Sequence, residues 1–217
     1  MSWFGRETGY DRARILAGAR RAAGSGRHAK AIALYERIRE VEPENTDVLR
    51  RLAAQRARAG QNEEAWRDCR EAAERVAVKG FVDQAIGIYR DFAHHVPREV
   101  EVWKAIADLE LERDRAPDAI AALLEGRAFF RSSRDLGDAL ALLRRARRID
   151  PTHFDANFDL AGVLIRGGAG PRARTLLLEL ERHVSGTQLR RLRGRLLRLS
   201  PTPRAAWRWL SALVIGR

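Results

Sequence analysis

Cysteine and lysine are both scarce in this sequence. Its 217 residues include one cysteine, Cys69, which excludes an intramolecular disulfide framework and suits a reducing compartment. Only three of the 41 basic residues are lysine, and the rest are arginine. Together with the excess of alanine and glycine, this arginine bias is typical of the GC-rich codon usage of many bacteria.

Long apolar runs are also missing. The most apolar tail, residues 210–215, is far shorter than the roughly 20 residues that cross a bilayer. The first residues, MSWFGRETGYDR, lack the apolar core of a signal peptide, so a cytoplasmic location is expected. No window shows sustained apolar alternation with β-branched residues, whereas alanine, leucine, arginine and glutamate dominate. This composition predicts an all-α chain.

Residues that could carry catalysis or hold a metal are isolated from one another. His94 and His95 are adjacent, so they would point about 100° apart on a helix and could not easily share a metal. No Ser-His-Asp, Cys-His or paired-carboxylate arrangement stands out. The glycine-rich stretch 166–171 lacks the Gly-Lys-Ser/Thr ending of a phosphate-binding loop and is expected to be a turn between helices. We therefore predict a non-enzymatic protein without a metal or cofactor.

A repeat of 54 residues organises the chain. Pro43, Pro97 and Pro151 are equally spaced at this interval. The same shift superposes three sets of alanines: Ala53, Ala107 and Ala161; Ala65, Ala119 and Ala173; Ala85 and Ala139. Such a period is typical of a solenoid, in which each unit buries its apolar face against its neighbours.

The spacing inside the unit resembles the tetratricopeptide repeat. Ala139, Leu143 and Ala146 precede Pro151 by 12, 8 and 5 residues, and similar sets precede the other two prolines. Residues 103–107 also match the W-x2-L-G/A start of that motif. The resemblance implies a right-handed helical-repeat solenoid of antiparallel helices, here about 12 of them. Since the family motif has about 34 residues, the 54-residue period corresponds to one motif plus one extra helix.

Three regions are expected along the chain. Residues 1–11 form an aromatic segment with Trp3, Phe4 and Tyr10, either a cap over the first helix or a docking peptide. Residues 12–184 form the repeat array, with a long helix from about residue 62 to residue 78 shared by two overlapping motifs. Residues 185–217 form arginine-rich capping helices. Cys69 occupies a helix-packing position and is predicted to be buried.

The resemblance implies a partner-binding concave face. The matched groove positions hold Leu16, Arg20, Arg50, Arg58, Lys104, Leu111, Phe158 and Arg166. The recurring cations favour an acidic peptide or acidic helix as ligand, while ordinary solvated charges remain the alternative. Asparagines of the family's carboxylate clamp have no counterpart here, so a chaperone partner is not expected. The predicted function is that of a scaffold or adaptor.

The C-terminal end offers an alternative site. The net charge is +12, yet residues 1–181 hold 32 cations and 29 anions, whereas nine arginines and no acid follow Glu181. The candidate basic surface comprises Arg190, Arg191, Arg193, Arg195, Arg198, Trp207, Arg208 and Trp209. It is either a terminal cap or a contact for nucleic acid, an anionic surface or a second copy. Because the two tryptophans lie on different helix faces, we expect one to be exposed.

Overall fold

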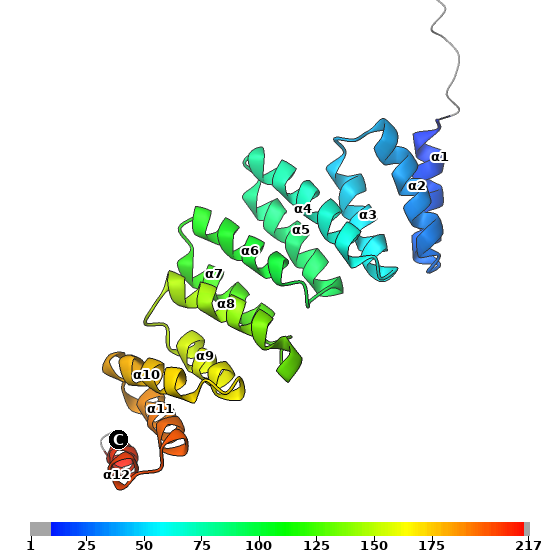
Figure 1. The fold of residues 1–217 in the computed structure, drawn as a ribbon. Coiled ribbons are helices and arrows are strands. Elements are labelled where there is room, and N and C mark those ends of the chain that lie inside the picture. The colour runs from blue at the N-terminus through cyan, green and yellow to red at the C-terminus, as the bar shows by residue number, and fades with distance from the viewer. Residues whose placement is uncertain (1–9, 215–217) are drawn as a thin grey trace, which may run out of the picture. The chain divides into compact units, whose positions relative to one another are not determined.

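The computed structural model describes residues 10–214, and within that range the chain consists of helices and loops without a strand. Two short 3-10 helices accompany twelve α-helices, so the expected all-α fold of about 12 helices is confirmed (Figure 1). Trp3 and Phe4 of the expected aromatic segment lie outside the described residues. The α-helices are α1 (Arg12–Gly24), α2 (His28–Val41), α3 (Thr46–Arg58), α4 (Asn62–Val78), α5 (Val82–His95), α6 (Val100–Glu112), α7 (Ala116–Arg127), α8 (Leu136–Ile149), α9 (Phe154–Arg166), α10 (Gly170–Leu180), α11 (Gly186–Leu199) and α12 (Pro203–Val214).

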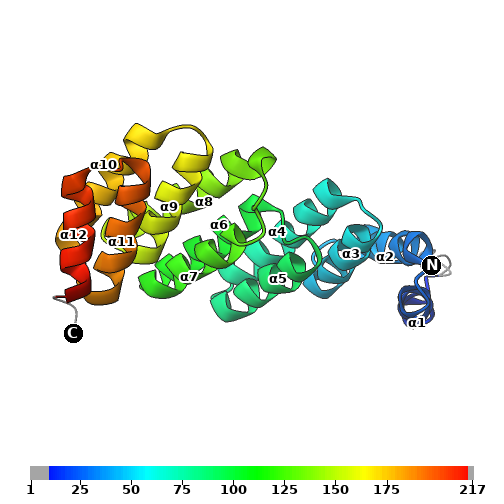
Figure 2. The same cartoon turned by 90° about the horizontal axis from the view of Figure 1, so that it is seen from below.

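The helices divide into two compact units. Unit 1 ends at Val102 and contains α1 to α5; unit 2 begins at Trp103, in the first turn of α6, and contains α7 to α12. Within unit 1 each helix packs against the next one along the chain, and the same holds for α7 to α12 in unit 2. Figures 1 and 2 show these neighbours running in opposite directions, joined by short turns.

Helix boundaries follow the 54-residue repeat. The first helices of the three-helix groups, α3, α6 and α9, begin 54 residues apart at Thr46, Val100 and Phe154. The second helices, α4, α7 and α10, keep the same interval with starts at Asn62, Ala116 and Gly170. The predicted long helix is confirmed, since α4 spans Asn62–Val78. The repeat therefore fixes where helices start as well as which residues are apolar.

The turns repeat a left-handed backbone conformation. The turn after α3 has Gly60 at φ 80°, and one period later Asp114 and then Gly168 have φ 57° and 76°. The turn after α4 has Gly80 at φ 85°, matched one period earlier by Gly26 at φ 71°. Glycine adopts positive φ without steric cost, which allows each helix to stop and the chain to reverse within a few residues.

Small residues occupy the helix crossings. Every alanine superposed by the repeat is buried, with side-chain exposures of 0–3%. Alanine at a crossing lets two helix backbones approach to about 8–10 Å, and larger neighbours such as Leu52, Ile106 and Leu160 fill the space beside it. A close approach is found in unit 2, where the Trp103 ring packs directly against the backbone of Gly126.

Substitution of Gly126 by alanine tests this packing. The added Cβ would lie 2.2–2.6 Å from the Trp103 ring, so the ring must shift, and we expect unit 2 to lose about 1–3 kcal/mol of stability. Gly87→Ala in α5 is the control, because nothing lies within 4 Å of its added Cβ; it should stabilise unit 1 by about 0.5–1 kcal/mol. Urea unfolding followed by circular dichroism measures both. Equal effects of the two substitutions would contradict the proposed contact.

Candidate binding groove

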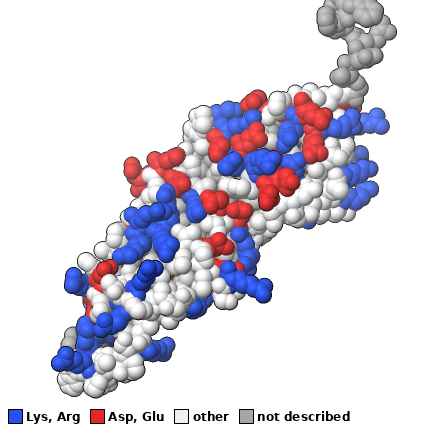
Figure 3. Space-filling model, viewed as in Figure 1, with Lys and Arg blue, Asp and Glu red and all other residues white. Residues whose placement is uncertain are grey.

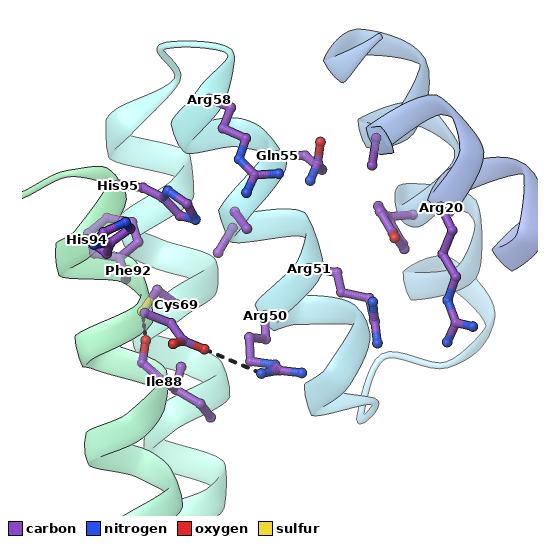
Figure 4. Close-up of a pocket in the computed structure, with 15 residues that line it drawn as sticks. Arg20, Arg50, Arg51, Gln55, Arg58, Cys69, Ile88, Phe92, His94 and His95 are labelled. Carbon is purple, nitrogen blue, oxygen red and sulfur yellow. Dashed lines mark hydrogen bonds and ion pairs between the residues drawn. The ribbon is translucent and has the colours of Figure 1, made fainter. Parts of the chain in front are cut away.

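Unit 1 contains a groove of about 480 Å³ that the first five helices line together. In Figure 4, Arg50, Arg51 and Arg58 of α3 lie between the α1–α2 pair on one side and α5 on the other. Arg20 of α1 and the histidines His94 and His95 of α5 complete the polar lining. The apolar lining consists of Ala23, Tyr35, Ala53, Ala54, Cys69, Ile88 and Phe92.

Helical spacing on α3 places three groove residues in one stripe. Arg50, Ala54 and Arg58 follow one another at steps of four residues and therefore lie on one face of the helix. The opposite face of α3 is buried against its neighbours through Leu49, Leu52 and other residues. The small side chain of Ala54 leaves open space between the two arginines.

A buried carboxylate holds α3 in place. Asp68 of α4 is 1% exposed and accepts hydrogen bonds from Arg39 of α2, at 3.0 Å, and from Arg56 of α3. Arg56 also pairs with Glu36 of α2 at 2.6 Å. Three helices are thus tied together by one charge network on the side of α3 away from the groove. Such a buried network favours a single arrangement of the helices more than it adds stability.

Only part of the positive charge in the groove is neutralised. Arg50 pairs with Asp91 at 3.4 Å and with Asp47 at 3.1 Å, and Arg51 pairs with Asp47 at 2.7 Å. Although burial opposes its ionisation, hydrogen bonds from both arginines hold the pKa of Asp47 below its usual value. Arg20 and Arg58 have no ion pair with any described residue. Asp91 is the single acid among the lining residues, beside four arginines.

The floor of the groove is apolar and chemically inert. Tyr35 is 2% exposed and Cys69 is 1% exposed, which confirms the prediction that this cysteine is buried. Burial raises the pKa of the Cys69 thiol well above its ordinary value, so the thiolate is not available as a nucleophile. The floor can therefore contact a ligand only through dispersion and apolar burial.

His94 and His95 of α5 line one side of the groove. Their rings contact edge to face, with centroids 5.7 Å apart. Burial, the nearby Arg58 and the neighbouring His94 lower the pKa of His95, which Asp91 opposes. Across the described part of the chain, no three side chains of the metal-binding types cluster. The two histidines therefore contribute hydrogen-bonding groups to the groove, and His95 contributes a charge that depends on pH.

The structure brings together three of the predicted groove residues, Arg20, Arg50 and Arg58. Leu16 instead packs, half-buried, against the hydrophobic core of α1 to α3. Sequence reasoning missed Arg51 and Gln55 of α3 and did not place the histidines of α5 in the groove. Gln55 is 5% exposed, and its side-chain oxygen lies 2.9 Å from Nδ1 of His28. Such contacts join residues far apart in the sequence, so no spacing rule identifies them.

The predicted groove residues of unit 2 have contacts of their own. Lys104 and Leu111 are half-buried on α6, and Arg166 donates a hydrogen bond to the Arg131 carbonyl at 3.2 Å. Phe158 of α9 is covered by Arg195 of α11, whose guanidinium carbon is 3.6 Å from the ring centroid. A contact of these four residues with a partner stays a prediction.

Arginines of α11 mainly join this helix to its neighbours. Arg195 also donates to the Phe158 carbonyl, and Arg191 pairs with Asp155 of α9 at 3.6 Å. Arg193 pairs with Glu181 at 2.7 Å and donates to the Arg208 carbonyl at 2.8 Å. Burial is the main cause of the lowered pKa of Arg195. These arginines therefore act as packing residues of unit 2.

The other residues of the candidate basic surface differ in their exposure. Arg190 is half-buried, whereas Arg198 is exposed. Arg208 is also exposed and pairs with Glu181. Over α11 and α12 the visible surface is rich in basic side chains, while basic and acidic side chains alternate over α1 to α5 (Figure 3). Trp207 is 73% exposed and Trp209 is half-buried, so the expectation that one tryptophan is exposed is confirmed.

A family model for the tetratricopeptide repeat matches residues 130–196, which include α8 to α10 and most of α11. The helices outside this segment repeat its register at the 54-residue interval. The matched part of the chain is similar to the tetratricopeptide repeat. Each 54-residue period contains a third helix in addition to the two helices of the usual motif, as predicted from the sequence. None of the described helices of this repeat protein is long and apolar enough to span a membrane.

Several solved structures are similar to this one at low sequence identity. A tetratricopeptide repeat protein from Parabacteroides merdae shares 15% identity, with 94% of this chain and 93% of that chain covered and a TM-score of 0.32. PilW, a type IV pilus biogenesis factor, shares 18% identity over 93% and 91% of the two chains, with a TM-score of 0.42. Yeast Tom70 shares 18% identity over 92% of this chain and 40% of its own, with a TM-score of 0.36. No curated protein matches the chain.

Titration of His95 tests the geometry of the groove. Because burial and Arg58 both disfavour its protonated form, its pKa should lie below the ordinary histidine value of about 6.5. Arg58→Gln should raise it, since one neighbouring positive charge is removed. NMR titration of the histidine resonances over roughly pH 4–9, which spans the protonation of a histidine, gives the pKa of His95 in the unaltered protein and in the variant. An unchanged pKa in the variant would place Arg58 away from the groove.

Proposed function

We propose that the groove of unit 1 binds a short acidic segment of a protein partner, so that the repeat array acts as a scaffold or adaptor. The observation that supports this most is the convergence of Arg20, Arg50, Arg51 and Arg58 on one apolar-floored groove with a single lining acid. Arg20 and Arg58, which have no ion pair with a described residue, are suited to charge-assisted hydrogen bonds with carboxylates.

The size of the groove suits a short segment of a partner. A helix of 10–12 Å diameter and 5.4 Å pitch occupies roughly 420–610 Å³ per turn. The groove of about 480 Å³ is thus comparable in size to one turn of an acidic helix or a few extended residues. Ala53 and Ala54 allow the ligand backbone to approach α3, while Phe92 and Tyr35 provide apolar contact. Acidic side chains on the ligand would then reach the arginines at the rim.

Electrostatic attraction also predicts how binding responds to salt. Arg20 and Arg58 are exposed, so their interaction with a ligand is screened at distances beyond about 8 Å at physiological ionic strength. Binding should weaken with added salt without disappearing, because the apolar floor does not depend on salt.

Nucleic-acid or anionic-surface binding by the C-terminal helices is the second candidate. It has less support, because Arg191, Arg193 and Arg195 are used in contacts within unit 2. The exposed Arg198 and Trp207 are the residues that favour it. Binding that falls steeply with salt and disappears with nuclease treatment would support this candidate instead.

Charge reversal in the groove tests the proposal. We expect Arg20→Glu/Arg58→Glu to lose partners that the unaltered protein captures from nuclease-treated extracts of its native cell, by about tenfold or more, because two rim cations become anions. Quantitative mass spectrometry of the captured proteins measures the loss.

The matched control is Arg172→Glu/Arg174→Glu on α10, where both arginines are exposed in unit 2. It changes the net charge equally and should retain the partners. If both variants capture the same proteins as the unaltered chain, the groove is not the binding site.

A further inference from the structure

Gln55 of α3 is a buried polar side chain in the lining of the unit 1 groove. It is 5% exposed, and its Oε1 atom lies 2.9 Å from Nδ1 of His28 on α2. Because an amide oxygen can only accept, Nδ1 of His28 carries the proton and donates it in this contact. The other end of the amide, the Nε2 amino group, donates no hydrogen bond to any described residue. The groove therefore contains a buried donor that no described part of the chain satisfies.

Two arginines flank this donor along α3. Arg51 precedes Gln55 by four residues and Arg58 follows it by three, so the three side chains lie along one face of the helix. All three line the groove, and in Figure 4 the Gln55 amide lies with Arg58 on one side and Arg51 on the other. Seven residues separate the two arginines, which is roughly 10 Å along the helix axis. A ligand that contacts both arginines therefore passes over Gln55.

An uncharged donor at this depth suits an uncharged acceptor. The floor of the groove is apolar, with Tyr35, Ala53 and Phe92 only 2–4% exposed. A carboxylate placed on that floor loses more hydration than it does at the rim, where Arg58 is exposed. Acidic side chains of a ligand therefore stay with the arginines. The group that remains for Gln55 is a backbone carbonyl of the same ligand, which a buried amide N–H can satisfy.

Free backbone carbonyls distinguish an extended segment from a helix. Inside an α-helix each carbonyl accepts from the N–H four residues ahead, and only the last four carbonyls lack such a partner. An extended chain has an unpaired carbonyl at every residue and advances about 3.3 Å per residue. About three extended residues therefore span the distance between Arg51 and Arg58. Such a segment can place an acid near each arginine and a carbonyl at Gln55 between them.

We propose that Gln55 determines the specificity of the groove: its amide donates to a backbone carbonyl of the ligand, so the groove takes an acidic segment in an extended conformation and not a helix. His28 holds the amide oxygen and thereby leaves Nε2 for the ligand. The arginines supply the attraction for acidic side chains, and Gln55 selects the backbone shape. This role rests on the proposed function, because it concerns the same groove and the same acidic ligand.

Two peptides of equal charge test the choice of shape. The extended probe is acetyl-Asp-Val-Asp-Val-Asp-Val-amide, because aspartate is a poor helix former and valine favours extended backbone. The helical probe carries the same number of aspartates on a hydrocarbon-stapled helix, since stapling removes the cost of forming an isolated short helix. We expect saturable binding of the extended probe to the full chain, with a shift of the Gln55 side-chain amide signals in nitrogen-15 NMR. The helical probe should bind about tenfold or more weakly.

Removal of the donor should weaken binding of the extended probe without changing any charge. Gln55→Leu is expected to bind it about three- to tenfold more weakly, the effect of one hydrogen bond. Gln84→Leu is the matched control, since Gln84 is exposed on α5 outside the groove, and it should bind like the unaltered protein. Esters that replace the peptide bonds of the probe one at a time weaken one carbonyl acceptor each. At one position the ester should lower the affinity of the unaltered protein by a similar factor but not that of Gln55→Leu.

The ester series uses the unaltered protein, so it decides the role of Gln55 even if thermal unfolding shows that Gln55→Leu is destabilised. Equal affinity of Gln55→Leu and Gln84→Leu for the extended probe, or equal affinity of every ester and the parent peptide, would overturn that role. Equal binding of the helical probe would overturn the preference for an extended ligand. If neither peptide binds at concentrations up to about 1 mM, the proposed function itself fails, and the role of Gln55 fails with it.

Discussion

Close contact between helices at small residues is the constraint on which this structure depends. The alanines superposed by the repeat are buried among larger side chains, and in unit 2 the Trp103 ring packs against the backbone of Gly126. A helix can shift along its neighbour only if such a pair separates, so the crossings fix the register of the array. The 54-residue repeat preserves these contacts, while residues elsewhere on the helices vary.

The crossings also decide which helix faces stay open to solvent. On α3 the buried face is committed to packing, which leaves Arg50, Ala54 and Arg58 as a stripe directed into the groove of unit 1. The Asp68 network holds α3 from its other side, so the arginines are presented on a fixed support.

Much of the fold and part of the site could be predicted from the sequence. Alanine spacing, the three prolines and the glycine turns specify local geometry, which is why the predicted bounds of α4 agree with the structure. The groove residues on one helix, such as Arg50 and Arg58, follow from helical periodicity. Contacts between distant residues do not: the cover that Arg195 forms over Phe158 depends on two helices meeting 37 residues apart. Gly60, Asp114 and Gly168 show a related limit, because one shared conformation is reached by two residue types.

Photo-cross-linking from the groove in living cells tests the central claim most directly. A benzoylphenylalanine residue in place of His94, which lines the groove and is exposed, should cross-link to a partner through a segment rich in aspartate and glutamate. The same residue in place of Gln84, exposed on α5 but outside the groove, should not capture that segment. Cross-linked segments without acidic residues at position 94, or identical partners at both positions, would contradict the claim that this groove recognises an acidic ligand.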